Sequence, residues 1–357
     1  MTTVRAPSSA VTSFVVASRY MPVYLALGLL VVVASIWAPA ALGGVALSAV
    51  APYGALLGIT ALGQMLVIMT GGIDLSVPGT LTLAAVIMVG VGQESSERIA
   101  FAILVALGAA AAIGLVNGIL IGGLKFNALI VTLAVGQVVI GIVNRYGRSF
   151  PVQRPVPEGL SDWTTGRILG VSPVFWTGLL ITLALVVGFR YTSVGRRFQV
   201  VGANPVASQV VGLRVNLNQL AAYVGAALLY AVAGIALAGL LRIPGVSAGT
   251  PYLLGPIAAV VIGGASLTGG LASPFSTLIA AFFLTGLNQM MRVMGLPTAL
   301  QFVVFGLVII GGMLVSGDRI TKGVEQLFRE RRRSRRRGGT ALGETEEGDA
   351  DQQAPTT

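Results

Sequence analysis

The chain has 357 residues, of which 55% are hydrophobic and only 10% are charged. Its mean hydropathy of +0.86 excludes an ordinary soluble globular protein. Most apolar stretches are long enough to cross about 30 Å of hydrocarbon as helices of roughly 20 residues. The sequence contains neither cysteine nor histidine, which excludes disulfides, thiol chemistry and the commonest general base and metal ligand.

The apolar pattern predicts an all-α integral membrane protein with about ten spanning helices. A transmembrane domain at residues 21–316 is expected to follow a polar cytoplasmic segment, residues 1–20. The spans are predicted, in chain order, at 21–38, 45–69, 76–92, 99–121, 128–143, 174–189, 220–241, 252–262, 276–294 and 299–315. A longer loop at residues 144–172 is predicted to be extracytoplasmic.

The net charge of +10 is placed unevenly along the chain. Much of it lies in Arg329–Arg337, directly after the last apolar segment. Basic residues beside a spanning helix mark the cytoplasmic side, so we interpret this run as topology and lipid-headgroup contact, not nucleic-acid binding. An even number of spans, with both termini cytoplasmic, puts Lys125 and residues 190–218 on the same inner side. Residues 317–357 are expected to form a basic, then acidic, disordered tail.

Residues 190–218 carry four arginines between two apolar runs and are predicted to contain a short helix outside the membrane. Asn204 suits the N-cap and Pro205 the first helical position. Val206, Val210 and Leu213 are spaced as one apolar stripe, and Gly212 suits a C-terminal stop. Two interpretations remain open here: a loop that lies on the lipid surface, or a helix that docks a soluble partner.

Two glycine-rich strings interrupt the apolar segments. Paired glycines permit a sharp turn and close backbone approach, and Asp74 or Ser76 can cap the next helix. The first string is therefore interpreted either as a tight turn or as a gate on a substrate path. The second string also begins Gly-Gly and continues with Leu and a hydroxyl residue, which hints at internal duplication. The candidate residues of the two strings are Gly71, Gly72, Asp74, Ser76, Gly263, Gly264, Ser266, Gly269 and Gly270.

The sequence offers little for enzyme or ion-coupled chemistry. It contains no Gly-x-x-x-x-Gly-Lys-Ser/Thr phosphate loop, and Asp74 and Arg292 are the ionisable residues inside the apolar body. A sodium site built from backbone carbonyls at broken helices remains possible. Gln64, Asn117 and Asn288 lie inside predicted spans, where each forms either an interhelical hydrogen bond or part of a translocation path. A stand-alone secondary carrier or channel is the alternative to a subunit driven by another protein.

Three motifs in order resemble the permease subunits of ribose/xylose-type (monosaccharide) ABC importers, in the branched-chain amino acid/sugar permease superfamily. The string Gly-Gly-Ile-Asp-Leu-Ser is complete at Gly71–Ser76, and Ile257–Gly270 closely matches a second family segment. The family's cytoplasmic loop motif, Gly-Arg … Gly-x-Asn … Ala … Gly, matches Gly195, Arg196, Gly202, Asn204, Ala207 and Gly212. The chain departs from the family pattern at Pro78, Ser276 and Arg292.

The resemblance implies a type II-importer-like permease fold in the cytoplasmic membrane. It implies import of a monosaccharide, ribose- or xylose-like, or a related small polar solute. The implied partners are a cytoplasmic ABC ATPase, an extracytoplasmic sugar-binding protein and a second permease subunit, identical or different. ATP and Mg would be bound by the ATPase, and no cofactor or metal by this chain, which is itself no enzyme. The implied coupling residues are Gly195, Arg196, Gly202, Asn204, Pro205, Val206, Ala207, Ser208, Gln209 and Gly212.

Overall fold

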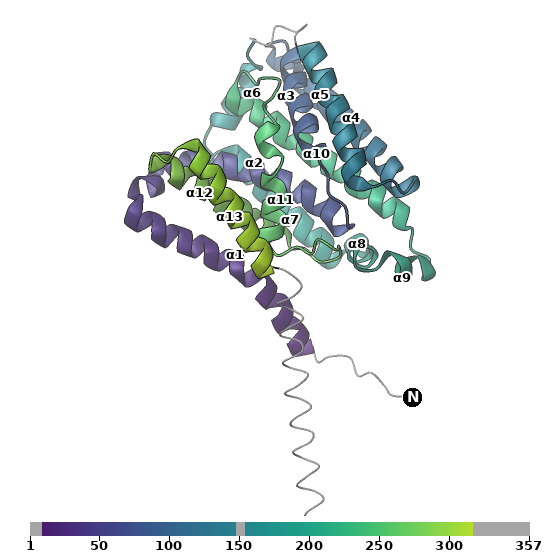
Figure 1. Cartoon of the computed structure of the whole chain (residues 1–357). Coiled ribbons are helices and arrows are strands. Elements are labelled where there is room, and N and C mark those ends of the chain that lie inside the picture. Colours follow the sequence, from purple (N-terminus) through teal and green to yellow (C-terminus); the bar gives the residue numbers. More distant parts are fainter. Residues whose placement is uncertain (1–8, 148–153, 317–357) are drawn as a thin grey trace, which may run out of the picture. The chain divides into compact units, whose positions relative to one another are not determined.

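The computed structural model describes residues 9–147 and 154–316 of the chain (Figure 1). The chain divides into two units, Tyr20–Ser316 and a smaller one made of Met1–Arg19 and Gly317–Thr357. Of the smaller unit, residues 9–19 are described, as the first part of helix α1 (Ser9–Trp37). Helix α1 therefore begins within the segment that was predicted to precede the first span. The predicted disordered tail lies outside the described residues.

The regular structure in the described part of the larger unit consists of helices and one isolated β-bridge between Ile168 and Val171. A π-helical turn, Ile119–Gly123, continues α4, and short 3-10 turns occupy Pro39–Leu42, Ser96–Arg98 and Thr250–Tyr252. The helices after α1 are α2 (Gly44–Met69), α3 (Val77–Gly90), α4 (Ile99–Gly118), α5 (Ala128–Gly147), α6 (Glu158–Thr165), α7 (Pro173–Tyr191), α8 (Ser193–Ala203), α9 (Pro205–Val210), α10 (Val215–Leu241), α11 (Gly255–Ile262), α12 (Pro274–Val293) and α13 (Thr298–Ser316).

Six of the described helices are long and apolar enough to cross a membrane: those in α1, α2, α4 with its π-helical turn, α5, α7 and α10. This confirms the prediction of an all-α, multi-pass membrane protein. Each of the ten predicted spans coincides with a helix, although α11 has only eight residues and is too short to cross the hydrocarbon alone. The number of crossings and the side of each terminus remain predictions.

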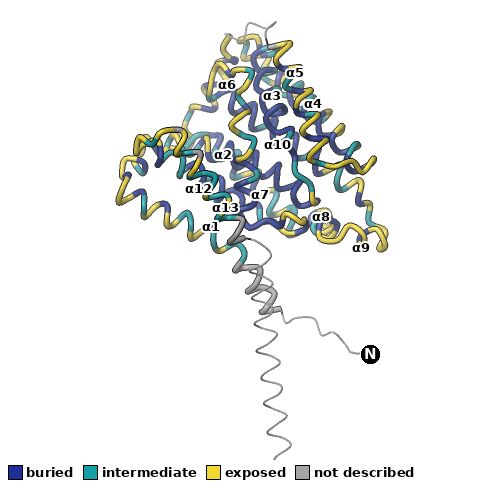
Figure 2. The backbone as a smooth tube through the Cα atoms, in the orientation of Figure 1, coloured by how far each residue is buried: buried dark blue, intermediate teal, exposed yellow. Residues whose placement is uncertain are grey.

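Helices α2 and α10 are the most buried of the six, with 61% of an 18-residue apolar stretch of each inside the protein (Figure 2). Helix α10 packs against α2, α3 and α4. Small residues let α4 approach closely: a Cβ on Gly114 would lie 2.7 Å from the Tyr223 backbone oxygen. Lipid supplies no hydrophobic drive between helices, so close van der Waals contact is what joins them. The buried stripe falls at every fourth position, at Ala102, Ala106, Ala110, Gly114, Gly118 and Gly122.

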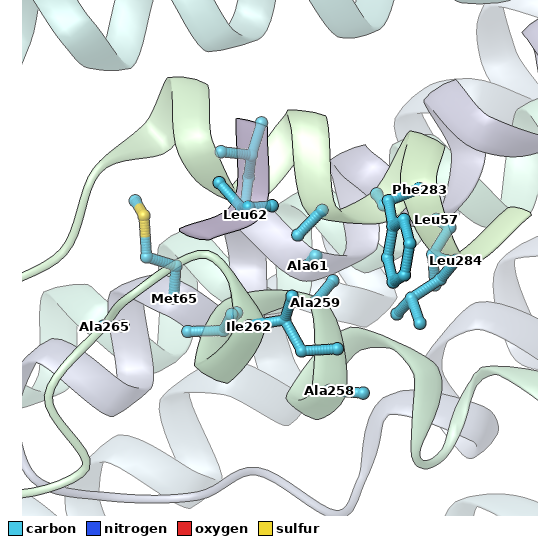
Figure 3. Close-up of a cluster of buried hydrophobic side chains, with 14 of the residues drawn as sticks. Leu57, Ala61, Leu62, Met65, Ala258, Ala259, Ile262, Ala265, Phe283 and Leu284 are labelled. Atoms are coloured by element: carbon cyan, nitrogen blue, oxygen red, sulfur yellow. The ribbon is translucent and has the colours of Figure 1, made fainter. Parts of the chain in front are cut away.

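Helix α2 also packs against α11 and α12, which in turn pack against each other. Their apolar side chains gather in one buried cluster (Figure 3). This cluster packs α2 against α11, and the C-terminal end of each of these helices leads into one of the two glycine-rich strings. The labelled members are Leu57, Ala61, Leu62, Met65, Ala258, Ala259, Ile262, Ala265, Phe283 and Leu284.

The loops at the two ends of α4 are hydrogen-bonded to different helices, α6 at one end and α10 at the other. Before α4, the Ser96 hydroxyl accepts a hydrogen bond from the Gly159 N–H of α6 (3.3 Å). Helix α6 was missed by the sequence patterns, which predicted only a loop at residues 144–172. After α4, Lys125 Nζ donates to Asn216 Oδ1 (2.6 Å) and Gln219 Oε1 (3.2 Å) at the start of α10. Lys125 and the end of the 190–218 segment therefore lie at the same end of α4.

Candidate functional site

The C-terminal end of α2 is closed by a Schellman motif. The Gly71 N–H donates to the Ile68 carbonyl oxygen (2.9 Å) and the Gly72 N–H to the Val67 carbonyl oxygen (3.2 Å). Gly71 has φ +81°, the left-handed region that glycine enters without strain. A Cβ on Gly72 would collide with the Tyr223 hydroxyl. The structure thus places a tight turn at Gly71–Gly72 and explains both glycines.

Asp74 holds the start of α3 from a buried position. Its side chain is 1% exposed, and Oδ1 accepts hydrogen bonds from the Ser76 N–H (2.8 Å) and the Ser76 hydroxyl (2.6 Å). The Ser76 hydroxyl accepts in turn from Asn117 Nδ2 of α4 (3.1 Å). The carboxylate, the hydroxyl and the amide form one chain of contacts that connects the turn to α4.

Gln64 of α2 holds the backbone of Asp74. In the amide orientation that matches donors to acceptors, its Oε1 accepts from the Asp74 N–H. Its nitrogen donates to the Asp74 carbonyl oxygen and to the Tyr230 hydroxyl, and all three distances are 3.1 Å. Irregular backbone inside a membrane protein needs such partners because no water supplies them.

Thr132 of α5 gives the same support one residue further on. The Leu75 N–H donates to Thr132 Oγ1 (2.9 Å), and this hydroxyl lies 3.3 Å from the Ile73 carbonyl oxygen. Thr132 is fully buried. Side chains from α2, α4 and α5 therefore converge on residues 73–76. We use the name Asp74 cluster for residues 73–76 together with Gln64, Asn117, Thr132, Tyr223 and Tyr230.

Three buried oxygens of the Asp74 cluster have no hydrogen-bond partner among the described residues: Asp74 Oδ2, Asn117 Oδ1 and the Tyr223 hydroxyl. Tyr223 also lines a polar pocket of about 230 Å³. The other residues that line this pocket are Thr70, Gly71, Gly72, Ile121, Lys125, Phe126, Ala128 and Gln219. Of the three predicted path residues, Gln64 and Asn117 thus meet in one cluster, whereas the half-buried Asn288 lies on α12 and outside that network.

The second glycine-rich string ends α11 with the same motif. The Gly264 N–H donates to the Val261 carbonyl oxygen (2.9 Å), the Ala265 N–H donates to the Val260 carbonyl oxygen (3.1 Å), and Gly264 has φ +84°. Aligning the two similar strings by sequence places Gly71 opposite Gly263. Aligning them by the positive-φ residue that closes each helix places Gly71 opposite Gly264, one residue further on.

The remainder of this string folds back on itself and reaches α2. The Ser266 hydroxyl is hydrogen-bonded to that of Thr268 (2.8 Å), inside the string and not to Asp74. The Gly270 N–H donates to the carbonyl oxygen of Met69 (2.9 Å), and Met69 is the last helical residue of α2. The two strings therefore meet through backbone, and the second adds no polar side chain to the Asp74 cluster.

A third segment, the end of α8, joins the same point. A Cβ on Gly202 would collide with the Met69 carbonyl oxygen and lie 2.8 Å from the Gly270 nitrogen. A Cβ on Gly269 would lie 2.5 Å from the Gly202 carbonyl oxygen. We call Met69, Gly202, Gly269 and Gly270 the glycine junction. Three segments far apart in the sequence touch there, backbone to backbone, because Gly202, Gly269 and Gly270 have no side chains.

The 190–218 segment forms two helices where the sequence predicted one. Helix α8 was missed, although Thr192 is a good N-cap and accepts from the Gly195 N–H (3.1 Å). The Cβ of a larger residue at Gly195 would collide with the Gly188 carbonyl oxygen, so α8 lies directly against the end of α7. Phe198 and Gly202 are buried on the same face, while Arg196 is exposed.

Helix α9 begins where the sequence predicted. Asn204 Oδ1 accepts from the Ala207 N–H (3.0 Å), Pro205 occupies the first turn, and Gly212 with φ +80° follows the end. The helix ends at Val210, so Leu213 lies beyond it. The predicted stripe through Leu213 is therefore wrong.

The faces of α9 differ sharply in exposure. Ser208 is 1% exposed, and its hydroxyl donates to the carbonyl oxygen of Asn204 (2.8 Å) and approaches that of Val200 (3.2 Å) at the end of α8. Val206, Val210 and Val211 are 72%, 84% and 71% exposed. Helix α9 is thus fixed to α8 by one face and presents apolar side chains, together with the exposed Ala207 and Gln209, on the other.

The sequence patterns did not predict that Thr132, Tyr223 and Tyr230 belong to the Asp74 cluster. The two tyrosines are seven residues apart, and thus on one face of α10, in an otherwise small and apolar stretch. A buried tyrosine hydroxyl usually needs a polar partner, so this pair was the available signal.

The apolar helices and the buried, irregular turns define a multi-pass membrane protein. Residues 46–313 match the family model described as "Branched-chain amino acid transport system / permease component". The chain belongs to this family, as the resemblance predicted. The match covers the Asp74 cluster, the glycine junction and α8–α9, and it confirms a multi-pass permease of the inner membrane.

Named relatives agree with this assignment. The ribose import permease of Escherichia coli strain K12 is 36% identical over 265 residues, which cover 73% of this chain and 82% of the relative. That of Bacillus subtilis strain 168 is 33% identical over 293 residues, 82% of this chain and 91% of the relative. The autoinducer 2 import permease of Enterobacter sp. strain 638 is 31% identical over 259 residues, 72% and 75% of the two chains. No solved structure matches.

Proposed function

We propose that this permease carries a monosaccharide or a similarly small, hydroxylated solute into the cell, driven by a separate ATPase. The printed names of its relatives, ribose and autoinducer 2 import permeases, support that solute class. The observation that carries the proposal is the glycine junction. It joins an exposed helix pair at one end of the protein to α2, the buried centre of the bundle.

Helix α9 is the surface that the ATPase would cover. Val206 and Val210 expose apolar side chains on a helix outside the spans, and Gln209 lies exposed between them. A soluble partner gains by burying such side chains, at about 25 cal/mol per Å² of apolar surface. The ATPase would also bind ATP and Mg, because this sequence has no phosphate loop.

Movement of α9 would reach the bundle through two rigid contacts. The Ser208 hydroxyl fixes α9 to the end of α8, and Gly202 at that end touches the backbone of Met69. Neither contact contains a long side chain that could absorb a displacement. Closing of the ATPase would therefore displace α8 and the end of α2 together. This displacement would open the translocation path to one side of the membrane and then to the other.

The opposite end of α4 would face the extracytoplasmic binding protein. There α6 contacts Ser96, and Arg154 Nε lies 3.7 Å from Glu94 Oε1 at the surface. A polar pocket of about 260 Å³ at the start of α2 is lined by Thr164, Arg167 and Ser172, among others. A second permease subunit would complete the assembly and the translocation path.

The test is uptake by liposomes that contain the permease, the ATPase and the binding protein. The double variant Val206→Asp, Gln209→Arg should insert and fold normally, because both side chains are exposed, but ATP hydrolysis should no longer drive uptake. Leu169→Asp is the matched control: it changes an exposed apolar residue in the loop between α6 and α7, and the ATPase should still copurify with it. Unchanged uptake by the double variant contradicts the proposal, as does concentrative uptake by liposomes that contain this chain alone.

A further inference from the structure

The Asp74 cluster contains a buried carboxylate without a counter-charge. Asp74 Oδ1 is occupied by Ser76, whereas Oδ2 has no partner among the described residues. Lys125, the basic side chain that lines the neighbouring pocket, donates to Asn216 and Gln219 instead. An ionised carboxylate taken out of water is very unfavourable unless it is paired or binds a metal ion.

Two further buried oxygens of the cluster are also unpartnered. Asn117 Nδ2 donates to the same Ser76 hydroxyl that donates to Asp74, so Asn117 and Asp74 flank one hydroxyl group. Asn117 Oδ1 accepts no hydrogen bond from the part of the chain that the structure describes, and Asn117 is fully buried. The unpartnered hydroxyl of Tyr223, 1% exposed, lies against Gly72, two residues before Asp74. Buried polar atoms without partners are rare, and here three occur in one cluster.

We propose that Asp74 Oδ2, Asn117 Oδ1 and the Tyr223 hydroxyl bind one monovalent cation, sodium or potassium. One carboxylate balances one positive charge, and neutral amide and hydroxyl oxygens are suitable further ligands for a hard cation. Sites for calcium, by contrast, usually combine more oxygens and more than one carboxylate.

The turn lies between two helix ends. The helix dipole is positive at the N-terminal end of α3, which favours an ionised Asp74, and negative at the C-terminal end of α2, which favours a cation. Unwound backbone after such a helix end is also where transporters hold coupling ions. The three ligands come from the turn, α4 and α10, so the ion would tie the turn to both helices. This inference concerns the stability of the turn and is independent of the proposed function.

The test is thermal unfolding of the purified full chain in detergent, in sodium, potassium or choline chloride at equal ionic strength. Sodium or potassium should raise the unfolding midpoint by about 3 °C or more over choline. Equilibrium binding with radioactive sodium or rubidium should give one ion per chain. Asp74→Asn should abolish both effects, and the surface control Glu94→Gln should retain both.

Tyr223→Phe removes one neutral ligand and should weaken ion binding about tenfold, with the full shift restored at saturating salt. An unfolding midpoint that is the same in choline as in both alkali salts, with no ion bound, overturns the proposal. That measurement uses the unmodified chain, so it decides the matter even if Asp74→Asn fails to fold. It also separates the proposal from a protonated Asp74 or a bound water, neither of which needs an alkali cation.

Discussion

Helices α2 and α11 end in the same way but lead into different environments. Both close with a Schellman motif on a glycine at φ +81° and +84°, respectively. After α2, the chain enters a buried polar cluster in which Gln64 of α2, Asn117 of α4 and Thr132 of α5 form hydrogen bonds with residues 73–76. After α11, the chain approaches the end of α2 and the end of α8 closely enough for direct backbone contact at Gly202, Gly269 and Gly270.

This difference shows that a glycine pair sets the turn but not its role. The residues that follow decide the role: Asp74 and Ser76 recruit polar partners, whereas Gly269 and Gly270 allow close backbone contact. One turn therefore holds the interior in place, and the other connects the interior to the exposed helices α8 and α9. Substitutions that affect only one of the two turns can test this division.

The largest effect is expected at the glycine junction. Gly202→Ala should destabilise the protein by more than about 3 kcal/mol, because the new Cβ collides with the Met69 carbonyl oxygen and neither backbone can move freely. The yield of monodisperse protein and its unfolding midpoint measure this. Gly108→Ala, the same change in α4 with nothing within 4 Å, should be neutral or slightly stabilising. Equal behaviour of the two variants would contradict the close contact at Gly202.

Next in size is the loss of Gln64. Gln64→Leu keeps a similar volume but leaves the Asp74 N–H, the Asp74 carbonyl oxygen and the Tyr230 hydroxyl without their partner. Unsatisfied buried groups of this kind should destabilise the protein by about 2–4 kcal/mol, measured as a lower unfolding midpoint. Gln137→Leu, on the exposed face of α5, should change the midpoint little. An unchanged unfolding midpoint of the Gln64→Leu variant would mean that Gln64 does not stabilise the turn at Asp74.

A smaller effect is expected from Thr132→Val. The valine is nearly isosteric but removes the acceptor of the Leu75 N–H, so we expect a loss of about 1–2 kcal/mol. Thr177→Val in α7, whose hydroxyl donates to the Pro173 carbonyl oxygen four residues earlier, serves as the matched control and should cost less. The two variants are compared by their unfolding midpoints, and an equal decrease would argue against a special role for Thr132.

The smallest effect isolates backbone conformation. Gly71→Ala should cost about 1 kcal/mol, because alanine resists φ +81° while its Cβ meets nothing closer than 3.9 Å. Gly71→Asn should be milder, since asparagine enters this region more easily. The difference in unfolding midpoint between the two variants measures the conformational term. A larger loss with asparagine would show that space, not φ, constrains this position.

The sequence predicted the helical scaffold well because long apolar runs and cap residues are local signals. Asn204, Pro205 and Gly212 placed α9 correctly for that reason. The patterns missed α6 and α8, which are short and mixed in polarity, and extended the α9 stripe too far, to Leu213. Helix α8 is amphipathic, but its buried face consists partly of glycines, which carry no hydrophobic signal.

Most contacts between residues far apart in the chain could not be predicted from the sequence patterns. Gln64 and Asn117 were recognised as polar residues in spans, but nothing in a linear pattern shows that both reach one turn. Asn288 carried the same signal and lies outside the cluster. The meeting of Gly202 with Met69 and Gly270 depends on how three segments fold together, and each glycine alone suggests only a turn.

We propose that α9 is the surface through which an ATPase drives this permease, and thiol labelling of α9 can test this proposal. The chain has no native cysteine, so Val210→Cys introduces a single thiol. We predict that it is labelled from the cytoplasmic side of membrane vesicles and becomes protected when the ATPase is bound. Leu169→Cys should be labelled only from the opposite side and should stay reactive. Labelling of Val210→Cys from outside, or undiminished labelling with the ATPase bound, would contradict the account.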